Sequence, residues 1–243
     1  MVEMPAIEAF ERGVADAATP AELWQMTAAY FQGSDVTRVI YLHFPPVGAP
    51  DDQVRATSSG FPEEQVARYI AERLYRDNPV LRYAQQHIDP VYRDDIEQLS
   101  PLSEREAAYL REMAAAGLGN GVGIPVYGPN GRSGQCGLGF RPGVRRLSPA
   151  LLTEYQWVCQ FAHLRYCAML AEQFPQPELT RRETEVLGWV ARGKSNGAIG
   201  SILGISAHTV DAHLRRIYVK LGVFDRISAA VRGIGVGLIH SEV

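Results

Sequence analysis

The spacing of apolar side chains predicts both helices and strands in the first two thirds of the chain. Residues 62–76 carry an apolar side chain every three or four positions, as an amphipathic helix does. The stretch VTRVIYLHF, at 36–44, is rich in β-branched and aromatic residues and therefore favours a strand. The same criteria, together with helix-start signals, predict helices over residues 4–16, 20–32, 62–76, 103–115 and 148–173.

A hairpin is predicted near the middle of the chain. The stretches GVGIPVYG and GQCGLGF, at 121–128 and 134–140, flank PNGRS, which contains the Asn-Gly turn signal. Strands mixed with helices favour a sandwich in which helices cover a sheet of about five strands. The apolar residues of the helix predicted at 148–173 cover more than one face, which leaves two interpretations open: a subunit interface or a fully buried helix.

A linker is predicted where EQFPQPELT, at 172–180, places two prolines within three residues, because proline cannot continue a helix. The chain is therefore divided into a first domain over 1–172, a linker over 173–179 and a second domain over 180–243.

Four short helices are predicted between residues 180 and 237. Thr180 and Glu183 have the spacing of a capping box at the start of the first helix, and Ser206 is the expected cap of the third. The LGIS turn at 203–206 joins the second and third helices as in a helix-turn-helix unit. The apolar stripe of the third helix, which we expect to face inward, is Val210, Leu214, Ile217 and Leu221.

The third of these helices carries the candidate chemistry for DNA binding. In a helix-turn-helix unit the second helix enters the major groove with its first turns against the base edges. Asp211 and Arg215 lie one turn apart; arginine pairs with guanine and a carboxylate accepts from cytosine. An ordinary exposed polar helix face would account for each of these residues singly. It accounts less well for their combination with a helix cap, a turn, an apolar stripe and flanking basic side chains. The residues predicted to contact bases or phosphates are Lys194, Ser206, His208, Thr209, Asp211, Ala212, His213, Arg215, Arg216 and Lys220.

Composition and charge narrow the classes of function. The net charge of −3 divides into −6 on residues 1–176 and +3 on residues 177–243, which favours a polyanion as partner of the C-terminal part. No apolar run reaches membrane-spanning length, and the three cysteines lack metal-site spacing. A cytoplasmic protein without metal, cofactor or membrane contact is expected. We found no signature of a hydrolase, so no catalytic residue is assigned and an enzyme such as a lactone hydrolase is disfavoured.

The segment from Leu179 to Arg226 resembles the LuxR-type helix-turn-helix domain of bacterial transcription regulators. This resemblance covers nearly the whole domain and implies an all-α fold of four helices. Three residues of the second helix depart from the pattern, and two of them are glycines that cost up to about 1 kcal/mol each in a helix. We therefore expect a softer second helix with the same fold. The departures are Gly197, Ala198 and Gly200.

The first domain is similar to the autoinducer-binding domain of acyl-homoserine-lactone receptors. The similarity rests on FPEEQVARYIAERLYRDNPV, at 61–80, and GIPVYGPNGRSG, at 123–134. A phosphorylated receiver domain is excluded because no lysine precedes Lys194, and no P-loop motif of an ATPase is present. Together the two resemblances imply an α+β fold, in which an N-terminal α-β-α sandwich that binds a ligand is followed by the all-α LuxR-type domain.

Several ligand anchors of the family are replaced in this chain. By the resemblance, Tyr69 matches the pocket tyrosine, whereas Gln65 stands at the position of a tryptophan or a neighbouring aromatic residue and Asn78 at an aspartate position. Asn78 either alters the pocket or caps the helix that begins at Pro79, and the two interpretations are compatible. The residues predicted to contact a ligand are Tyr41, Gln65, Tyr69, Asn78, Tyr92, Gln135 and Gly137.

These observations predict a quorum-sensing transcription regulator of the LuxR type, which binds a two-fold operator as a homodimer. The changed anchors indicate an atypical, "solo" member with little or no response to ordinary acyl-homoserine lactones. The alternative is a ligand-independent regulator or anti-activator that pairs with another regulator. A cavity smaller than about 300 Å³ would favour this alternative.

Overall fold

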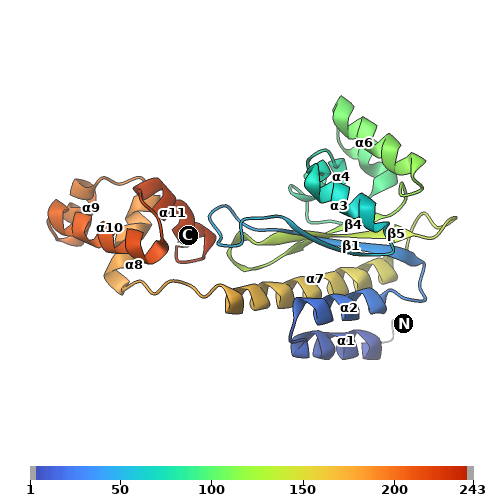
Figure 1. The fold of residues 1–243 in the computed structure, drawn as a ribbon, viewed down its shortest axis with the longest axis horizontal. Coiled ribbons are helices and arrows are strands. Elements are labelled where there is room, and N and C mark those ends of the chain that lie inside the picture. The colour runs from blue at the N-terminus through green and yellow to red at the C-terminus, as the bar shows by residue number, and fades with distance from the viewer. Residues whose placement is uncertain (1–3, 240–243) are drawn as a thin grey trace. The chain divides into compact units, whose positions relative to one another are not determined.

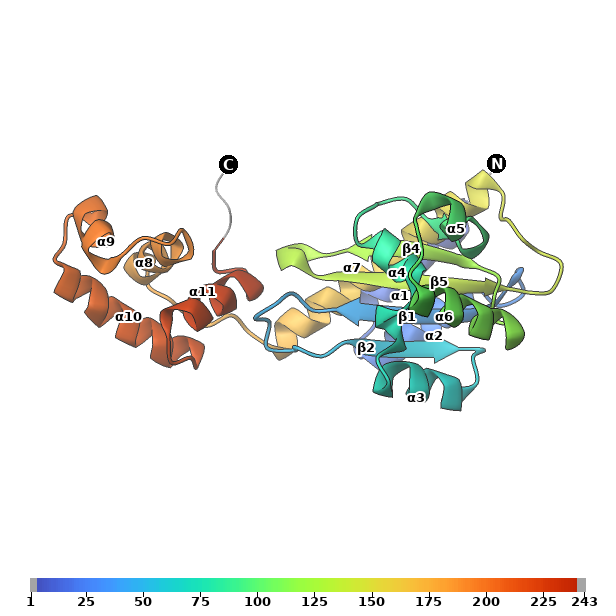
Figure 2. The same cartoon turned by 90° about the horizontal axis from the view of Figure 1, so that it is seen from above.

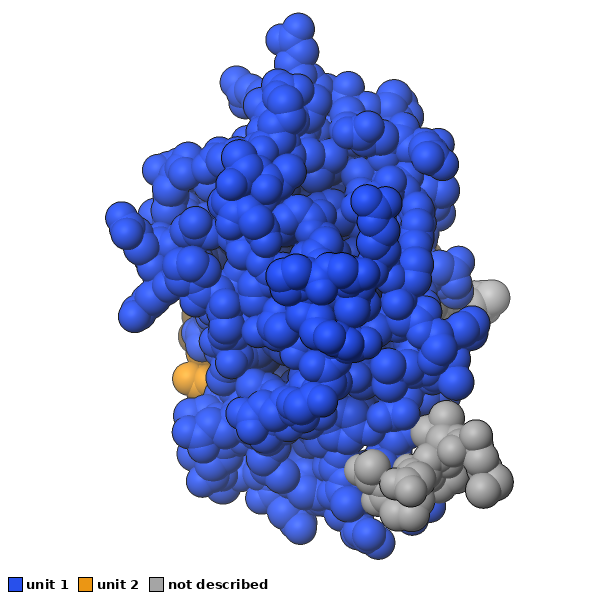
Figure 3. Space-filling view, turned by 90° about the vertical axis from the view of Figure 1, so that its right-hand side faces the viewer, with its two compact units in different colours: residues 1–44, 54–128, 132–169 blue, residues 45–53, 129–131, 170–243 orange. Residues whose placement is uncertain are grey.

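The computed structural model describes residues 4–239 and divides into two compact units (Figure 3). The first unit comprises residues 1–44, 54–128 and 132–169, and the second comprises 45–53, 129–131 and 170–243. Residues 1–3 and 240–243, the outer ends of the two predicted domains, lie outside the described residues.

A five-stranded antiparallel sheet forms the centre of the first unit, with the strand order β2-β1-β5-β4-β3. Figure 2 shows β2, β1, β5 and β4 in this order. Helices α1, α2 and α7 cover one face of the sheet, and α3, α4 and α6 cover the other (Figure 1). The predicted α+β class is therefore confirmed. The strands are β1 Val36–Phe44, β2 Arg55–Ser59, β3 Val91–Tyr92, β4 Val122–Tyr127 and β5 Ser133–Phe140. The helices are α1 Met4–Asp16, α2 Pro20–Tyr30, α3 Glu63–Ala71, α4 Pro79–Ala84, α5 Ile96–Leu99, α6 Glu104–Ala115 and α7 Pro149–Gln173.

The two faces of β1 separate two hydrophobic clusters, because successive side chains of a strand point to opposite sides. Val39 belongs to the cluster that includes α1, α2 and α7, whereas Leu42 packs with Tyr69 of α3 and Tyr109 of α6. The face of β1 that carries Leu42 is therefore the face covered by α3 and α6.

The predicted helix over 62–76 is wrong in one respect, since the structure breaks it. Helix α3 ends at Ala71, Arg73 adopts the left-handed conformation with φ of 56°, and a short 3-10 helix follows at Leu74–Arg76. After the break, Leu74 packs in the same cluster as Leu42. The apolar periodicity of 62–76 does not predict this contact. Strand β2 escaped prediction because RATSS contains no large apolar residue.

The second unit contains the four helices predicted from the sequence: α8 Arg181–Ala191, α9 Asn196–Leu203, α10 Ala207–Leu221 and α11 Arg226–Gly235. Each helix begins after a side chain that accepts a hydrogen bond from its first turn, and these caps are Thr180, Ser195, Ser206 and Asp225. Gly204 and Gly222, with φ of 67° and 65°, provide the left-handed conformation that ends α9 and α10.

Candidate functional site

The turn between α9 and α10 is held by two local hydrogen bonds. The amide of Ile205 donates to the carbonyl of Gly200 at 2.9 Å, and the amide of Thr209 donates to Ser206 Oγ at 3.0 Å. A Cβ atom on Gly200 would lie 2.6 Å from the carbonyl oxygen of Ile205, whereas one on Gly197 would meet open space. Close packing against the backbone of Ile205 therefore favours glycine at position 200, which the expectation of a softer helix did not include.

One stripe of α10 is buried, as predicted. Its members are almost fully inaccessible and pack on α8 and α9, which fixes the rotation of α10 about its own axis. The stripe consists of Val210, Leu214, Ile217 and Leu221. The opposite side of the helix is consequently held facing solvent, and it carries most of the residues predicted to contact DNA.

An ion pair lies on this solvent-facing side. Arg215 Nη2 is 2.9 Å from Asp211 Oδ2, one helical turn away, and the Arg215 side chain is 78% exposed. His208, Arg216 and Lys194 are also exposed. The two residues predicted to read bases therefore form one polar unit, and the arginine keeps donors available to a groove.

Lys220, by contrast, is engaged within the unit. Its Nζ lies 2.7 Å from Oε2 of Glu183, whose side chain is only 3% exposed and also accepts from the Thr180 amide at 2.8 Å. Burial tends to raise the pKa of Glu183, but the hydrogen bonds from Lys220 and Thr180 outweigh it and hold that pKa below its usual range. Sequence patterns alone did not reveal this second role of Lys220.

The second candidate site is a cavity of about 120 Å³ in the first unit, between the sheet and α3, α4 and α6. Five of the seven residues predicted to contact a ligand line it, although Gln65 is otherwise exposed. They are Gln65, Tyr69, Asn78, Gln135 and Gly137. Sequence reasoning did not identify the other lining residues, among them Arg38 and Arg93. Arg38 was detectable in principle, because it interrupts an otherwise largely apolar strand segment.

Tyr41 and Tyr92 lie outside this cavity. Tyr41 is on the opposite face of β1, where its hydroxyl hydrogen-bonds His163 Nδ1 at 2.7 Å and lines a cavity of about 380 Å³ against α2 and α7. Tyr92 lies under the guanidinium of Arg146, and its hydroxyl accepts from the Leu147 amide at 3.3 Å. The side chains that face the smaller cavity from β1 are Arg38, Ile40 and Leu42, so strand alternation places Tyr41 on the other side.

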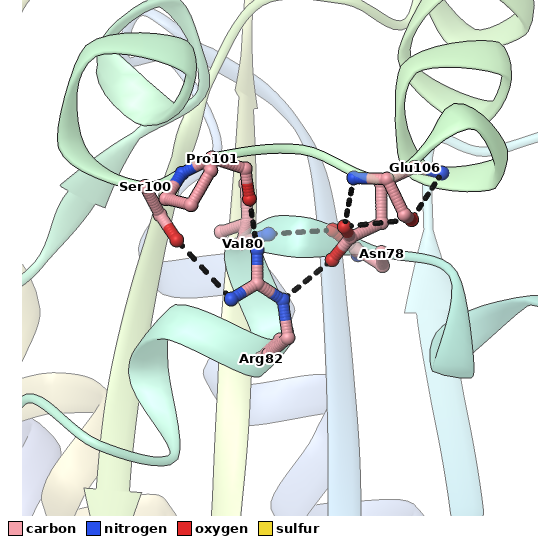
Figure 4. Close-up of polar contacts among 7 residues, drawn as sticks. Asn78, Val80, Arg82, Ser100, Pro101 and Glu106 are labelled. Carbon is pink, nitrogen blue, oxygen red and sulfur yellow. Dashed lines mark hydrogen bonds and ion pairs between the residues drawn. The ribbon is translucent and has the colours of Figure 1, made fainter.

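Asn78 caps a helix and contacts the pocket tyrosine at the same time. Its Oδ1 accepts from the amide of Val80 at 3.1 Å, and its Nδ2 donates to the hydroxyl of Tyr69 at 3.1 Å. Nearby, Arg82 of α4 reaches Glu106 of α6 at 2.5 Å and Ser100 at 3.1 Å, which ties together the segments beside the cavity (Figure 4).

Metal and membrane sites were also considered. Among residues 4–239, no three His, Cys, Asp or Glu side chains gather in a group that could hold a metal ion. Across the same range, every helix is too short or too polar to cross a bilayer.

Comparisons with known proteins match both units in order. The family of autoinducer binding domains matches residues 19–166, and the family described as bacterial regulatory proteins, luxR family, matches residues 177–232. The transcriptional activator protein AhyR of Aeromonas hydrophila is 31% identical over 186 residues, which cover 73% of this chain and 71% of AhyR. The quorum sensing-dependent regulator RpaR of Rhodopseudomonas palustris is 32% identical over 191 residues, covering 75% and 74% respectively.

Solved structures agree at the level of the fold. A crystal structure of SdiA from Escherichia coli superposes with a TM-score of 0.77 at 22% identity, covering 96% of this chain and 97% of SdiA. Because an autoinducer-binding domain and a LuxR-type helix-turn-helix follow one another along the chain, this protein belongs to the LuxR family of quorum-sensing transcription regulators.

Proposed function

We propose that this regulator binds a two-fold operator as a homodimer in the cytoplasm, with α10 of each subunit in the major groove. The observation that carries the proposal is the rotation of α10. Its apolar stripe is buried, so the Asp211–Arg215 pair is held on the exposed side. Arg215 lies near the middle of α10, and an arginine on the exposed face of a recognition helix can donate two hydrogen bonds to guanine, while the carboxylate orients it or accepts from cytosine.

The remaining polar residues of this surface fit phosphate contacts, which give affinity and position without reading sequence. Ser206 and Thr209 stand at the start of α10, where amide groups and the helix dipole favour an anion. Lys220 keeps a partly exposed side chain beside Glu183 and contributes at the outer end. The proposed DNA contacts are Lys194, Ser206, His208, Thr209, Asp211, Ala212, His213, Arg215, Arg216 and Lys220.

Arg215→Ala tests this interface. We expect loss of a bidentate base contact to cost about 1–3 kcal/mol and to relax the preference at one position of the operator. The assay is selection of bound DNA from a random library by the wild-type protein, followed by titration of each variant on the selected sequence. Arg12→Ala, at an exposed site on α1, is the control with the same change in charge. Equal affinity and equal base preference of both variants would remove α10 from the interface.

The homodimer needs a separate measurement. Sedimentation of the full chain, with and without the selected operator, should give two subunits per operator. A single subunit bound to an operator without two-fold symmetry would contradict the proposed geometry.

We further propose that the smaller cavity is the signal site of the regulator and that ordinary acyl-homoserine lactones occupy it poorly. Asn78 supports this, because its carbonyl oxygen already caps α4 and its amide already donates to Tyr69. A neutral amide oxygen is also a weaker acceptor than a carboxylate for a ligand N–H. In a thermal-shift panel of common lactones, a large stabilisation by any of them would overturn this part of the proposal.

One observation favours the alternative of a ligand-independent regulator or anti-activator. The cavity of about 120 Å³ is smaller than the roughly 300–1,000 Å³ of ordinary small-molecule sites. Under the alternative, side chains of the protein itself fill the site and activity depends on pairing with another regulator. Mass spectrometry of protein purified without added ligand separates the two functions, since only the first predicts a bound small molecule.

A further inference from the structure

Three buried nitrogen donors on the walls of the smaller cavity lack a hydrogen-bond partner among the described residues. They are Gln135 Nε2, Arg38 Nε and Arg93 Nη1. Gln135 is only 4% exposed, so water at the surface of the protein does not satisfy its amide. A buried donor without a partner is costly, and several of them at one cavity point to an acceptor that is missing from the protein itself.

The sheet makes room for two of these donors. A Cβ atom on Gly123 of β4 would lie 2.2 Å from Gln135 Nε2, and one on Gly139 of β5 would lie 2.7 Å from Arg38 Nε. Larger residues at either position would displace the donors from the floor of the cavity. The absence of side chains at Gly123 and Gly139 therefore leaves room for these two nitrogen atoms beside the cavity.

The charge around the cavity is positive and uncompensated. Glu112 is the one acidic side chain among the described residues that line it, and Arg68 engages Glu112 at 2.5 Å. Arg38 donates to the carbonyl of Gly117 and to Asn120, both of which are neutral acceptors. Burial, and then the neighbouring charge of Arg93, lower the pKa of Arg38. Two guanidinium groups close enough to repel each other, without a carboxylate between them, favour the binding of an anion at this cavity.

Apart from polar residues such as Gln65, Asn78 and Asn120, much of the remaining lining is apolar, and it limits the size of the ligand. It includes Ile40, Leu42, Val80, Leu118 and Leu138. A cavity of about 150 Å³ lined by such side chains holds a benzene molecule, so about 120 Å³ accommodates a ring or a short chain without a long acyl tail.

We propose that the signal for this regulator is a compact carboxylic acid, whose carboxylate accepts from Arg38, Arg93 and Gln135 and whose apolar body packs on the aliphatic wall. The proposal rests on the function proposed above for this cavity. It adds the chemical class of the ligand: a monoanion with an aromatic or short aliphatic body in place of a neutral lactone amide. The planar fork of a guanidinium group matches the two oxygens of a carboxylate and can bind them bidentately.

The test uses the purified full chain and a thermal-shift panel of benzoate, cinnamate and hexanoate, each beside its primary amide, with inorganic phosphate as a further probe. At a concentration about 100 times its Kd, a ligand of this class should raise the melting temperature by roughly 5–10 °C. The matching amide should give little shift. Equal shifts from acid and amide, a shift from phosphate alone, or no shift from any of the acids would overturn the proposal.

Two variants locate the effect. Arg93→Gln and Gln135→Met should each raise the Kd of the best acid at least tenfold in calorimetric titration, whereas the exposed control Arg12→Gln should leave it unchanged. Arg38 is not substituted, because it also holds backbone carbonyl groups. Gln135→Met keeps an unbranched side chain of similar volume and decides the question if Arg93→Gln does not fold. Unchanged affinity in Gln135→Met, with the protein folded, would overturn the assignment of the carboxylate to this site.

The outcome for the ligand class is separable from the function on which it rests. A large shift from a lactone together with none from the acids would leave a ligand-sensing regulator and remove only the carboxylate. No shift from either class, and no small molecule in the purified protein, would favour the ligand-independent regulator. DNA binding through Arg215 is measured independently of both results.

Discussion

Replacement of Glu183 by glutamine should destabilise the second unit by about 1.5–3 kcal/mol. Glutamine keeps the shape of the side chain and can still accept from the Thr180 amide, so the helix cap is retained. What is lost is the charge-assisted hydrogen bond to Lys220, now 2.7 Å long and shielded at the carboxylate, whose side chain is 3% exposed. The cost stays below the roughly 3–5 kcal/mol of a fully buried pair, since the Lys220 side chain is 36% exposed and regains water.

The effect should depend on pH in a defined direction. The pKa of Glu183 is lowered in the folded protein, because the hydrogen bonds from Lys220 and Thr180 outweigh the opposing effect of burial. Its stabilisation is therefore fully present above the unfolded pKa, about 4.3, and is lost as pH falls through the folded value. The difference in free energy of unfolding between the wild type and Glu183→Gln should be constant from pH 7 to 5.5 and should become smaller below about pH 4.5.

Urea unfolding of the full chain measures this effect. Trp189 lies in α8, and substituting the other two tryptophans, Trp24 and Trp157, by phenylalanine makes its fluorescence specific for the second unit. Glu185→Gln is the matched control on the same helix, where the carboxylate pairs with surface arginines and its loss should change stability little. An equal effect of both variants, or a difference that does not narrow in acid, would refute the reasoning.

Two further predictions concern packing and burial. Gly200→Ala should destabilise the second unit by about 1–3 kcal/mol, although alanine is the better helix former, because the new Cβ atom would collide with the Ile205 carbonyl. Gly197→Ala, where the Cβ atom meets open space, should stabilise the unit by up to about 1 kcal/mol. Urea unfolding measures both variants, and stabilisation by both would contradict the close approach at Gly200. Burial, and secondarily the charge of His43, lower the pKa of His163 to about 3, so this histidine stabilises the fold fully above about pH 6.5 and loses that contribution as pH falls toward 3. His163→Asn should therefore reduce the slope of stability against pH in this range by up to about 1.4 kcal/mol per unit, whereas the exposed His87→Asn should not.

The helices of the second unit and the strand at 36–44 could be predicted because their signals are local. Caps and apolar periodicity act within a few residues, and the structure has Thr180 and Ser206 as the expected caps and Gly204 within the expected turn. The break after Ala71 could not be predicted in this way, since the pattern of 62–76 is compatible with one continuous helix.

The sequence by itself determined which residues are grouped on each face of a helix or strand, because a side chain's direction follows from the period of its own element. Tertiary structure alone decided which face meets which partner. It placed Tyr41 against His163 instead of the smaller cavity, and it engaged Lys220 with Glu183, 37 residues earlier in the chain. It also brought together Arg38 and Arg93, whose convergence depends on the register of strands and the path of loops, and local propensity carries no information about either.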